Sequence, residues 1–269
     1  MKLSKYLDRI GFSGNASPTV ASLTELMRAH TLGVPFENLD VQLGRALTTS
    51  VDTAYSKIVE TGRGGWCYEQ NGLFGWALTQ IGFAVTRLSA AVRLEERGDI
   101  ALNNHLTLLV QCDDGATDYL VDVGFGGSQL GPIPLQECAV SHPPFELSLI
   151  KLGSRWRLVE AYATSRLSYD FSAEQADEAA LAAKCEWLQT SPESSFVLSL
   201  VAQRRLADAH RVLRGRVFTE RRLDGETSRL IGSPDELVSV LRNAFGLNVP
   251  EVRSLWQRIE ARHAEFFDH

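Results

Sequence analysis

The spacing of hydrophobic positions divides the chain into three parts with different periods. In the first third, apolar residues recur at helical spacing, as over 21–30, where the helix is expected to stop at Gly33. A second helix is predicted with Asp52 at its cap, and a third from Gly64-Gly65 onward. We therefore expect the first third to be helical.

The middle third has the shorter period that is typical of β-strands. Apolar-rich runs at 83–92, 105–112 and 119–123 are separated by turn residues. Two further strands are predicted at 146–152 and 156–160. Several strands at such short spacing predict a small barrel or a curled sheet.

The last third mixes helical and strand signals. Residues 172–175 have the pattern of a capping box that opens an alanine-rich helix, and 233–236 predict another capped helix. The runs 217–223 and 226–231 flank Asp224-Gly225, a strong signal for a two-residue hairpin loop. This part is therefore expected to contain both helices and strands.

Composition and charge exclude several classes of protein. The chain has 269 residues, of which 44% are hydrophobic and 22% charged, so it can bury a sizeable core. Its net charge of -6 argues against a nucleic-acid partner. No apolar run is long enough for a membrane-spanning helix, so no membrane partner is expected. No nucleotide-binding loop or metal-ligand spacing occurs, so we predict no metal.

Cysteine usage and the first residues point to the cytoplasm. The four cysteines are widely spaced and include no CxxC pair, which favours reduced thiols over a disulfide framework. The chain reaches Asp8 and Arg9 without the apolar stretch of a signal peptide. We therefore expect a cytoplasmic protein.

The most unusual segment is 63–71, Arg-Gly-Gly-Trp-Cys-Tyr-Glu-Gln-Asn. Its two glycines permit a tight turn, and Cys67 then falls at the start of the predicted helix. Unpaired N–H groups and the positive end of the helix dipole favour an anion there, so this thiol should lose its proton readily. The alternative interpretation is a small buried hydrophobe beside a glycine turn.

A cysteine nucleophile needs a base, and His105 is the best placed of the six histidines. It stands at the head of a strongly apolar strand, where a histidine can also be merely structural. Asp122 is embedded in the apolar run 119–123, and a buried carboxylate requires hydrogen-bond donors. Both residues are unusual for their surroundings, which makes them candidates for one site.

Strand pairing predicts that these two residues meet. If Asp114-Gly115 forms a two-residue turn, Thr107 faces Asp122, and His105 lies diagonally across on the same face. Diagonal neighbours are about 7–8 Å apart at the backbone, within reach of two side chains. A slip of one residue would place them on opposite faces. The sequence thus predicts an aspartate that orients a histidine and a cysteine that this histidine activates.

Segment 63–71 resembles the signature of the arylamine N-acetyltransferases. The resemblance extends through 34–40, the strand that begins with His105-Leu106, and 121–127, and the opening 6–12 is also similar. It runs in order over residues 6–131 and continues more weakly to the C-terminus. Two departures are mild: Trp66 stands where Tyr or Phe is usual, and Asn104 replaces a small or hydroxyl residue.

The resemblance implies an α+β fold of three domains. These are an N-terminal helical bundle (1–82), a central β-barrel (83–171), and an interdomain helix with an α/β lid (172–269). The core is similar to that of cysteine proteases and transglutaminases.

The implied activity carries an acetyl group from acetyl-CoA, as co-substrate, to an arylamine, an arylhydrazine or an N-hydroxyarylamine, as in xenobiotic metabolism. Cys67 is then the nucleophile of a ping-pong reaction, His105 the base and Asp122 the residue that orients His105.

The resemblance also assigns supporting and binding residues. Arg63 is expected to pair with Glu37 and so hold the turn before the nucleophile. The acceptor pocket is expected to be lined by three phenylalanines, Phe36, Phe125 and Phe196. Gly124, Gly126 and Gly127 could let the backbone approach CoA, although the same glycines would equally suit a turn.

Three other functions remain open at this point. The same scaffold could use another acyl donor or close an amide bond. A Cys-His-Asp arrangement also serves thiol hydrolases and transglutaminase-like enzymes on unrelated folds. The third possibility, a binding module without catalysis, fits poorly, because a buried Asp122 without a task would be a liability.

Overall fold

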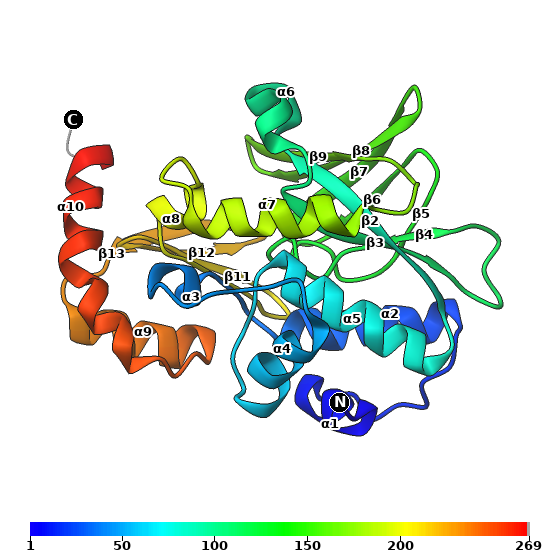
Figure 1. The fold of residues 1–269 in the computed structure, drawn as a ribbon, viewed down its shortest axis with the longest axis horizontal. Helices are drawn as coiled ribbons and strands as arrows, with labels where there is room; N and C mark the ends of the chain where they lie inside the picture. The colour runs from blue at the N-terminus through cyan, green and yellow to red at the C-terminus, as the bar shows by residue number, and fades with distance from the viewer. Residues whose placement is uncertain (268–269) are drawn as a thin grey trace.

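The computed structural model describes residues 1–267 and shows a helical N-terminal part (Figure 1). Its elements are α1 (Leu3–Ile10), α2 (Val20–Gly33), α3 (Leu39–Gln42), α4 (Val51–Tyr55), the π-helical turn η1 (Ser56–Glu60) and α5 (Cys67–Ile81). The predicted stop at Gly33 is confirmed. The predicted cap at Asp52 is wrong: α4 begins after Ser50, and Asp52 lies inside its first turn.

The middle of the chain forms an antiparallel sheet of eight strands that closes almost completely into a barrel. Its spatial order is β5-β4-β3-β2-β9-β8-β7-β6. The strands are β2 (Ala84–Val92), β3 (His105–Gln111), β4 (Tyr119–Val121), β5 (Ile133–Pro134), β6 (Cys138–His142), β7 (Phe145–Leu152), β8 (Arg155–Tyr162) and β9 (Ser165–Phe171). Two short helical turns, α6 (Leu94–Arg97) and η2 (Gly98–Ala101), follow β2. The five predicted strands are confirmed, whereas β5, β6 and β9 were not predicted.

The pairing of β3 with β4 has the predicted register. Leu108 is paired with Val121, which places Thr107 opposite Asp122. The predicted two-residue turn at Asp114-Gly115 is nevertheless wrong, because a longer loop, 112–118, joins the two strands. Asp114 instead accepts a hydrogen bond from the backbone N–H of Val20, so tertiary contacts shape this loop.

The C-terminal part combines a five-stranded antiparallel sheet with helices. The sheet order is β1-β10-β11-β12-β13. Its elements are β1 (Phe36–Glu37), β10 (Val201–Arg205), β11 (His210–Arg214), β12 (Val217–Arg222) and β13 (Gly225–Leu230), with α7 (Glu178–Thr190), α8 (Ser195–Leu198), α9 (Pro234–Phe245), η3 (Pro250–Leu255) and α10 (Trp256–Phe267). Since β1 belongs to the N-terminal part, this sheet ties the two ends of the chain together.

Local signals in this region were predicted with mixed success. The capping box at 172–175 is wrong: α7 begins at Glu178, where the Asp177 carboxylate accepts hydrogen bonds from two backbone N–H groups of the first turn. The hairpin is confirmed, but its loop is Leu223-Asp224, because Arg222 pairs with Gly225. Ser233 caps α9 as predicted.

The arrangement places α5 at the centre of the molecule. In Figure 1, the barrel and the helices α9 and α10 lie towards opposite ends, with α5 and α7 between them. Apolar residues of α7, including Leu181 and Leu188, pack in one cluster with Trp66 and Cys67 at the start of α5. Along residues 1–267, no helix is long and apolar enough to cross a bilayer.

Candidate active site

The predicted nucleophile is the first residue of α5. Cys67 follows Trp66, and its side chain is buried, with 2% exposed. The turn before it needs glycine for a steric reason: a Cβ on Gly64 would lie 2.2 Å from the carbonyl oxygen of Pro35. Backbone hydrogen bonds between Gly65 and both Pro35 and Glu37 fasten this turn to β1. The two glycines therefore allow this turn to lie close to the backbone of Pro35, so that α5 begins in the interior of the protein.

His105 and Asp122 meet beside this helix, as the register predicted. The Nε2 atom of His105 lies 2.6 Å from Oδ2 of Asp122, and both residues are almost fully buried. Burial alone would lower the pKa of His105, but the Asp122 carboxylate and a hydrogen bond with Cys67 outweigh it and raise this pKa to about 10. The imidazole thus keeps its proton at neutral pH and stands as a positively charged group beside Cys67.

The carboxylate of Asp122 has the donors that its burial requires. Its Oδ1 accepts hydrogen bonds from Nδ2 of Asn71 at 2.8 Å and from the backbone N–H of Gly124 at 2.9 Å. Asn71 lies one turn after Cys67 on α5, and its own oxygen accepts from the N–H of Val123. One amide side chain therefore joins the helix of the nucleophile to the loop that carries the aspartate.

The three candidate CoA-binding glycines have packing roles in the structure. A Cβ on Gly124 would lie 2.8 Å from the Cα of Cys67, so only glycine lets this loop touch the nucleophile. Gly126 and Gly127 have φ angles of +101° and +103°, which favour glycine, and they pack against Gln203 and Arg205. Contact with CoA stays a prediction.

The three candidate acceptor-binding phenylalanines border the triad from two directions. The ring of Phe196 lies 6.2 Å from that of Phe36 and 5.5 Å from that of Trp66, which precedes the nucleophile. The ring of Phe125 lies 5.4 Å from that of His105. Aromatic surface therefore stands beside both Cys67 and His105, although the three rings do not form one continuous cluster.

The predicted pair of Arg63 and Glu37 is present within a larger buried network of charges. The guanidinium of Arg63 lies 2.7 Å from Oε1 of Glu37 and 3.1 Å from Oδ1 of Asp40. Lys57, which was not predicted, lies 2.9 Å from carboxylate oxygens of both Asp40 and Glu69. The side chains of Arg63 and Lys57 thus form ion pairs with three carboxylates next to the turn that carries Cys67.

This network reaches the nucleophile through Glu69. Its Oε2 accepts a hydrogen bond from the backbone N–H of Trp66 at 3.1 Å and so caps the helix on which Cys67 is the first residue. Burial, the largest effect, and the nearby Glu37 raise the pKa of Glu69, although Lys57 lowers it. Burial lowers the pKa of Lys57, but the three carboxylates raise it by more than burial lowers it, so the ammonium group stays charged.

The chain is similar to known proteins over nearly its whole length. The sequence profile of a family described as N-acetyltransferase matches residues 19–254. An arylamine N-acetyltransferase of Mycolicibacterium smegmatis is 34% identical over 278 residues, which cover 100% of this chain and 99% of that protein. A Salmonella typhimurium protein named arylamine N-acetyltransferase / N-hydroxyarylamine O-acetyltransferase is 33% identical, with 93% of this chain and 90% of the relative covered.

A solved structure extends the likeness to the fold. The Mycobacterium marinum arylamine N-acetyltransferase in complex with CoA superposes with a TM-score of 0.88 at 33% identity. The match covers 97% of this chain and 98% of the other. Sequence and fold therefore agree over nearly the whole length.

Proposed function

The chain belongs to the arylamine N-acetyltransferase family and has acetyl-CoA-dependent arylamine N-acetyltransferase activity, and we propose that it works through an acetyl thioester on Cys67. The observation that carries this proposal is the position of His105, which is hydrogen-bonded to Asp122 and interacts with Cys67 on its other side. This is the arrangement that activates a thiol nucleophile and returns its proton.

In the first half-reaction, His105 holds the proton that has left the sulfur of Cys67. The thiolate attacks the thioester carbonyl of acetyl-CoA, and a new C–S bond to Cys67 forms as the bond to the CoA sulfur breaks. His105 gives its proton to the departing CoA thiolate. Asp122 keeps the ring oriented throughout, because its carboxylate holds Nε2 and leaves Nδ1 for the reacting groups.

In the second half-reaction, the nitrogen of the arylamine attacks the acetyl carbon on Cys67. His105 removes a proton from that nitrogen, the C–S bond breaks, and His105 returns the proton to the sulfur. Arylhydrazines present the same kind of nitrogen, and N-hydroxyarylamines present an oxygen, so we include them among the acceptors. We assign ring binding to Phe125, to Phe196 and to Phe36, which packs against Phe196.

The buried state of the triad sets a condition on both half-reactions. Cys67 and His105 are only 2% and 3% exposed, so we propose that neighbouring groups move aside as acetyl-CoA and the acceptor approach the thiol. We assign the approach of CoA to the backbone of 124–127, which already contacts the Cα of Cys67 at Gly124. We also propose that the enzyme works in the cytoplasm, where acetyl-CoA is available and thiols stay reduced.

Intact-mass measurement tests this mechanism directly. The protein is mixed with acetyl-CoA alone and should gain one acetyl group, which peptide mapping should place on Cys67. Addition of an arylamine should then remove it much faster than water does. Cys67→Ala should gain no acetyl group, whereas the control Cys185→Ala should behave like the wild type, because burial raises the pKa of the Cys185 thiol to about 12.

The same measurement separates the remaining alternatives. Acylation by a longer acyl-CoA but not by acetyl-CoA would indicate another donor on this scaffold. Rapid discharge by water without an amine would indicate a thiol hydrolase. Acetylation of a cysteine other than Cys67 would overturn the mechanism.

A further inference from the structure

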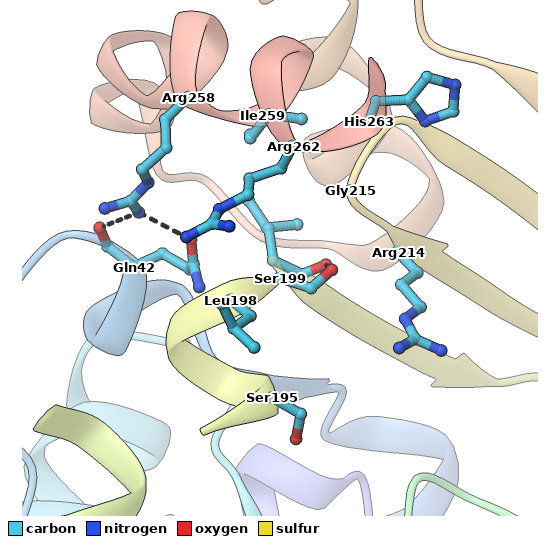
Figure 2. A pocket seen from close by; sticks show the side chains of 11 residues that line it. Gln42, Ser195, Leu198, Ser199, Arg214, Gly215, Arg258, Ile259, Arg262 and His263 are labelled. Atoms are coloured by element: carbon cyan, nitrogen blue, oxygen red, sulfur yellow. Dashed lines mark hydrogen bonds between the residues drawn. The ribbon is translucent and has the colours of Figure 1, made fainter. Parts of the chain in front are cut away.

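A cavity of about 370 Å³ lies outside the candidate active site (Figure 2). It is enclosed by α8, by the turn between β11 and β12, and by α10, with Gln42 of α3 at one end. None of Cys67, His105 and Asp122 lines it. Its volume is within the range of small-molecule sites.

The lining of this cavity is selective for charge. Three arginines, Arg214, Arg258 and Arg262, line it, and within residues 1–267 no aspartate or glutamate does. This is notable in a chain with 33 acidic and 27 basic residues, where chance would favour acids. The side chain of Arg214 has no hydrogen-bond or ion-pair partner among the described residues. An anion is the ligand that this set of donors attracts.

Three aliphatic side chains also line the cavity. These are Leu198, Leu200 and Ile259, of which Leu200 and Ile259 are buried. The hydroxyl groups of Ser195 and Ser199 add neutral donors at the side formed by α8 (Figure 2). A ligand with a charged head and an aliphatic body would match both halves of the cavity.

Hydrogen bonds connect the cavity to Phe196, one of the three candidate acceptor-binding phenylalanines. Arg258 donates to the backbone oxygen and to Oε1 of Gln42, both at 2.7 Å. The amide nitrogen of Gln42 in turn donates to the backbone oxygen of Phe196. The ring of Phe196 packs on Trp66, next to Cys67. An anion that draws Arg258 away from Gln42 would therefore loosen the support of Phe196.

We propose that this cavity binds a small anion with an aliphatic body, and that its occupation slows the transfer of acetyl groups to aryl acceptors. The site is separate from that of either substrate. Binding of the anion affects the second half-reaction, because Phe196 is one of the residues assigned to acceptor binding.

Equilibrium dialysis with labelled octanoate tests binding without any turnover. Octanoate should bind saturably to the wild type, and the neutral octanamide should not. The double variant Arg214→Gln with Arg262→Gln should weaken binding by about tenfold or more, since two of the three cations are lost. Arg155→Gln removes an exposed arginine of the barrel and should leave binding unchanged.

Three binding results would overturn the proposed site. These are the absence of saturable binding, equal affinity in the double variant, and displacement of octanoate by CoA or by an arylamine, which would assign the ligand to the active site.

The coupling to Phe196 is tested by kinetics. Discharge of acetyl-Cys67 by an arylamine is then timed with and without saturating octanoate. It should slow in the wild type but not in the double variant; equal rates in the wild type would overturn the coupling through Phe196.

Discussion

The Nδ2 atom of Asn71 lies 2.8 Å from Oδ1 of Asp122, and this bond crosses from the helix of the nucleophile to the strand side of the triad. Asn71 is fully buried: its Nδ2 also donates to the backbone oxygen of Leu106, and its Oδ1 accepts from the backbone N–H of Val123, so the side chain is held in one orientation. One amide side chain therefore links the helix of Cys67 to the His105–Asp122 pair.

Replacing this amide should impair catalysis although Asn71 touches no reacting atom. In Asn71→Ala, Asp122 loses one of its donors and the two halves of the triad lose their connection, so we expect Cys67 acetylation to slow by about a hundredfold. Single-turnover acetylation followed by intact mass measures this. Asn243→Ala, on the exposed side of α9, is the matched control. A rate within about twofold of the wild type would show that Asn71 does not position the triad.

Asp122 and His105 should act as one unit. Asp122→Asn keeps the shape of the side chain but offers His105 an amide in place of a charge, so acetylation should fall by about four orders of magnitude. Adding His105→Gln to it should cost little more, because residues of one catalytic unit are strongly non-additive. Losses that multiply in the double variant would instead indicate independent roles.

The His105–Asp122 pair should also make stability depend on pH. The pKa of His105 is about 10 in the folded protein, against an ordinary value of 6.5. The folded state thus binds the proton more tightly, so the stabilisation is complete below pH 6.5 and is lost as the pH rises through about 10. The difference in melting temperature between the wild type and His105→Gln should shrink over this interval. A difference that grows with pH would contradict the assignment.

Removing the buried lysine should destabilise the fold and the turn that carries Cys67. Lys57→Met leaves Glu37, Asp40 and Glu69 with Arg63 as the remaining cation of the network, so the free energy of unfolding should fall by about 3–5 kcal/mol. Denaturant titration measures this, and acetylation at low temperature reports on the site. Lys5→Met, on the exposed side of α1, should change neither. If Lys57→Met is as stable as this control, the network is not a support of the fold.

A role of Phe125 in acceptor binding can be distinguished from a role in the core by comparing the two half-reactions. Phe125→Ala should weaken the use of aryl acceptors about tenfold or more while acetylation of Cys67 by acetyl-CoA is spared. Phe74→Ala removes a fully buried ring of α5 and should cost about 3–5 kcal/mol of stability and slow both half-reactions. Equal damage to both half-reactions in Phe125→Ala, with a lowered melting temperature, would make it an ordinary core residue.

Sequence alone determined those features that neighbouring residues encode. The stop of α2 at Gly33, the start of α5 after two glycines and the cap of α9 at Ser233 depend on contacts within a few residues. The register of β3 against β4 was predicted correctly, although the two-residue turn from which it was derived is wrong. Once that register is set, alternation along the two strands places His105 and Asp122 on the same face.

Tertiary structure decided what depends on partners far away in the chain. Lys57 lies in an unremarkable stretch, and only folding brings it to Glu37, Asp40 and Glu69. Asp114 was expected in a two-residue turn, but it lies in a longer loop in which its carboxylate accepts a hydrogen bond from the backbone N–H of Val20. Likewise, Asn71 stood in a recognised segment, yet its bond to Asp122 spans 51 residues. Local propensities cannot encode such contacts, because burial and charge compensation are defined only once the segments have packed together.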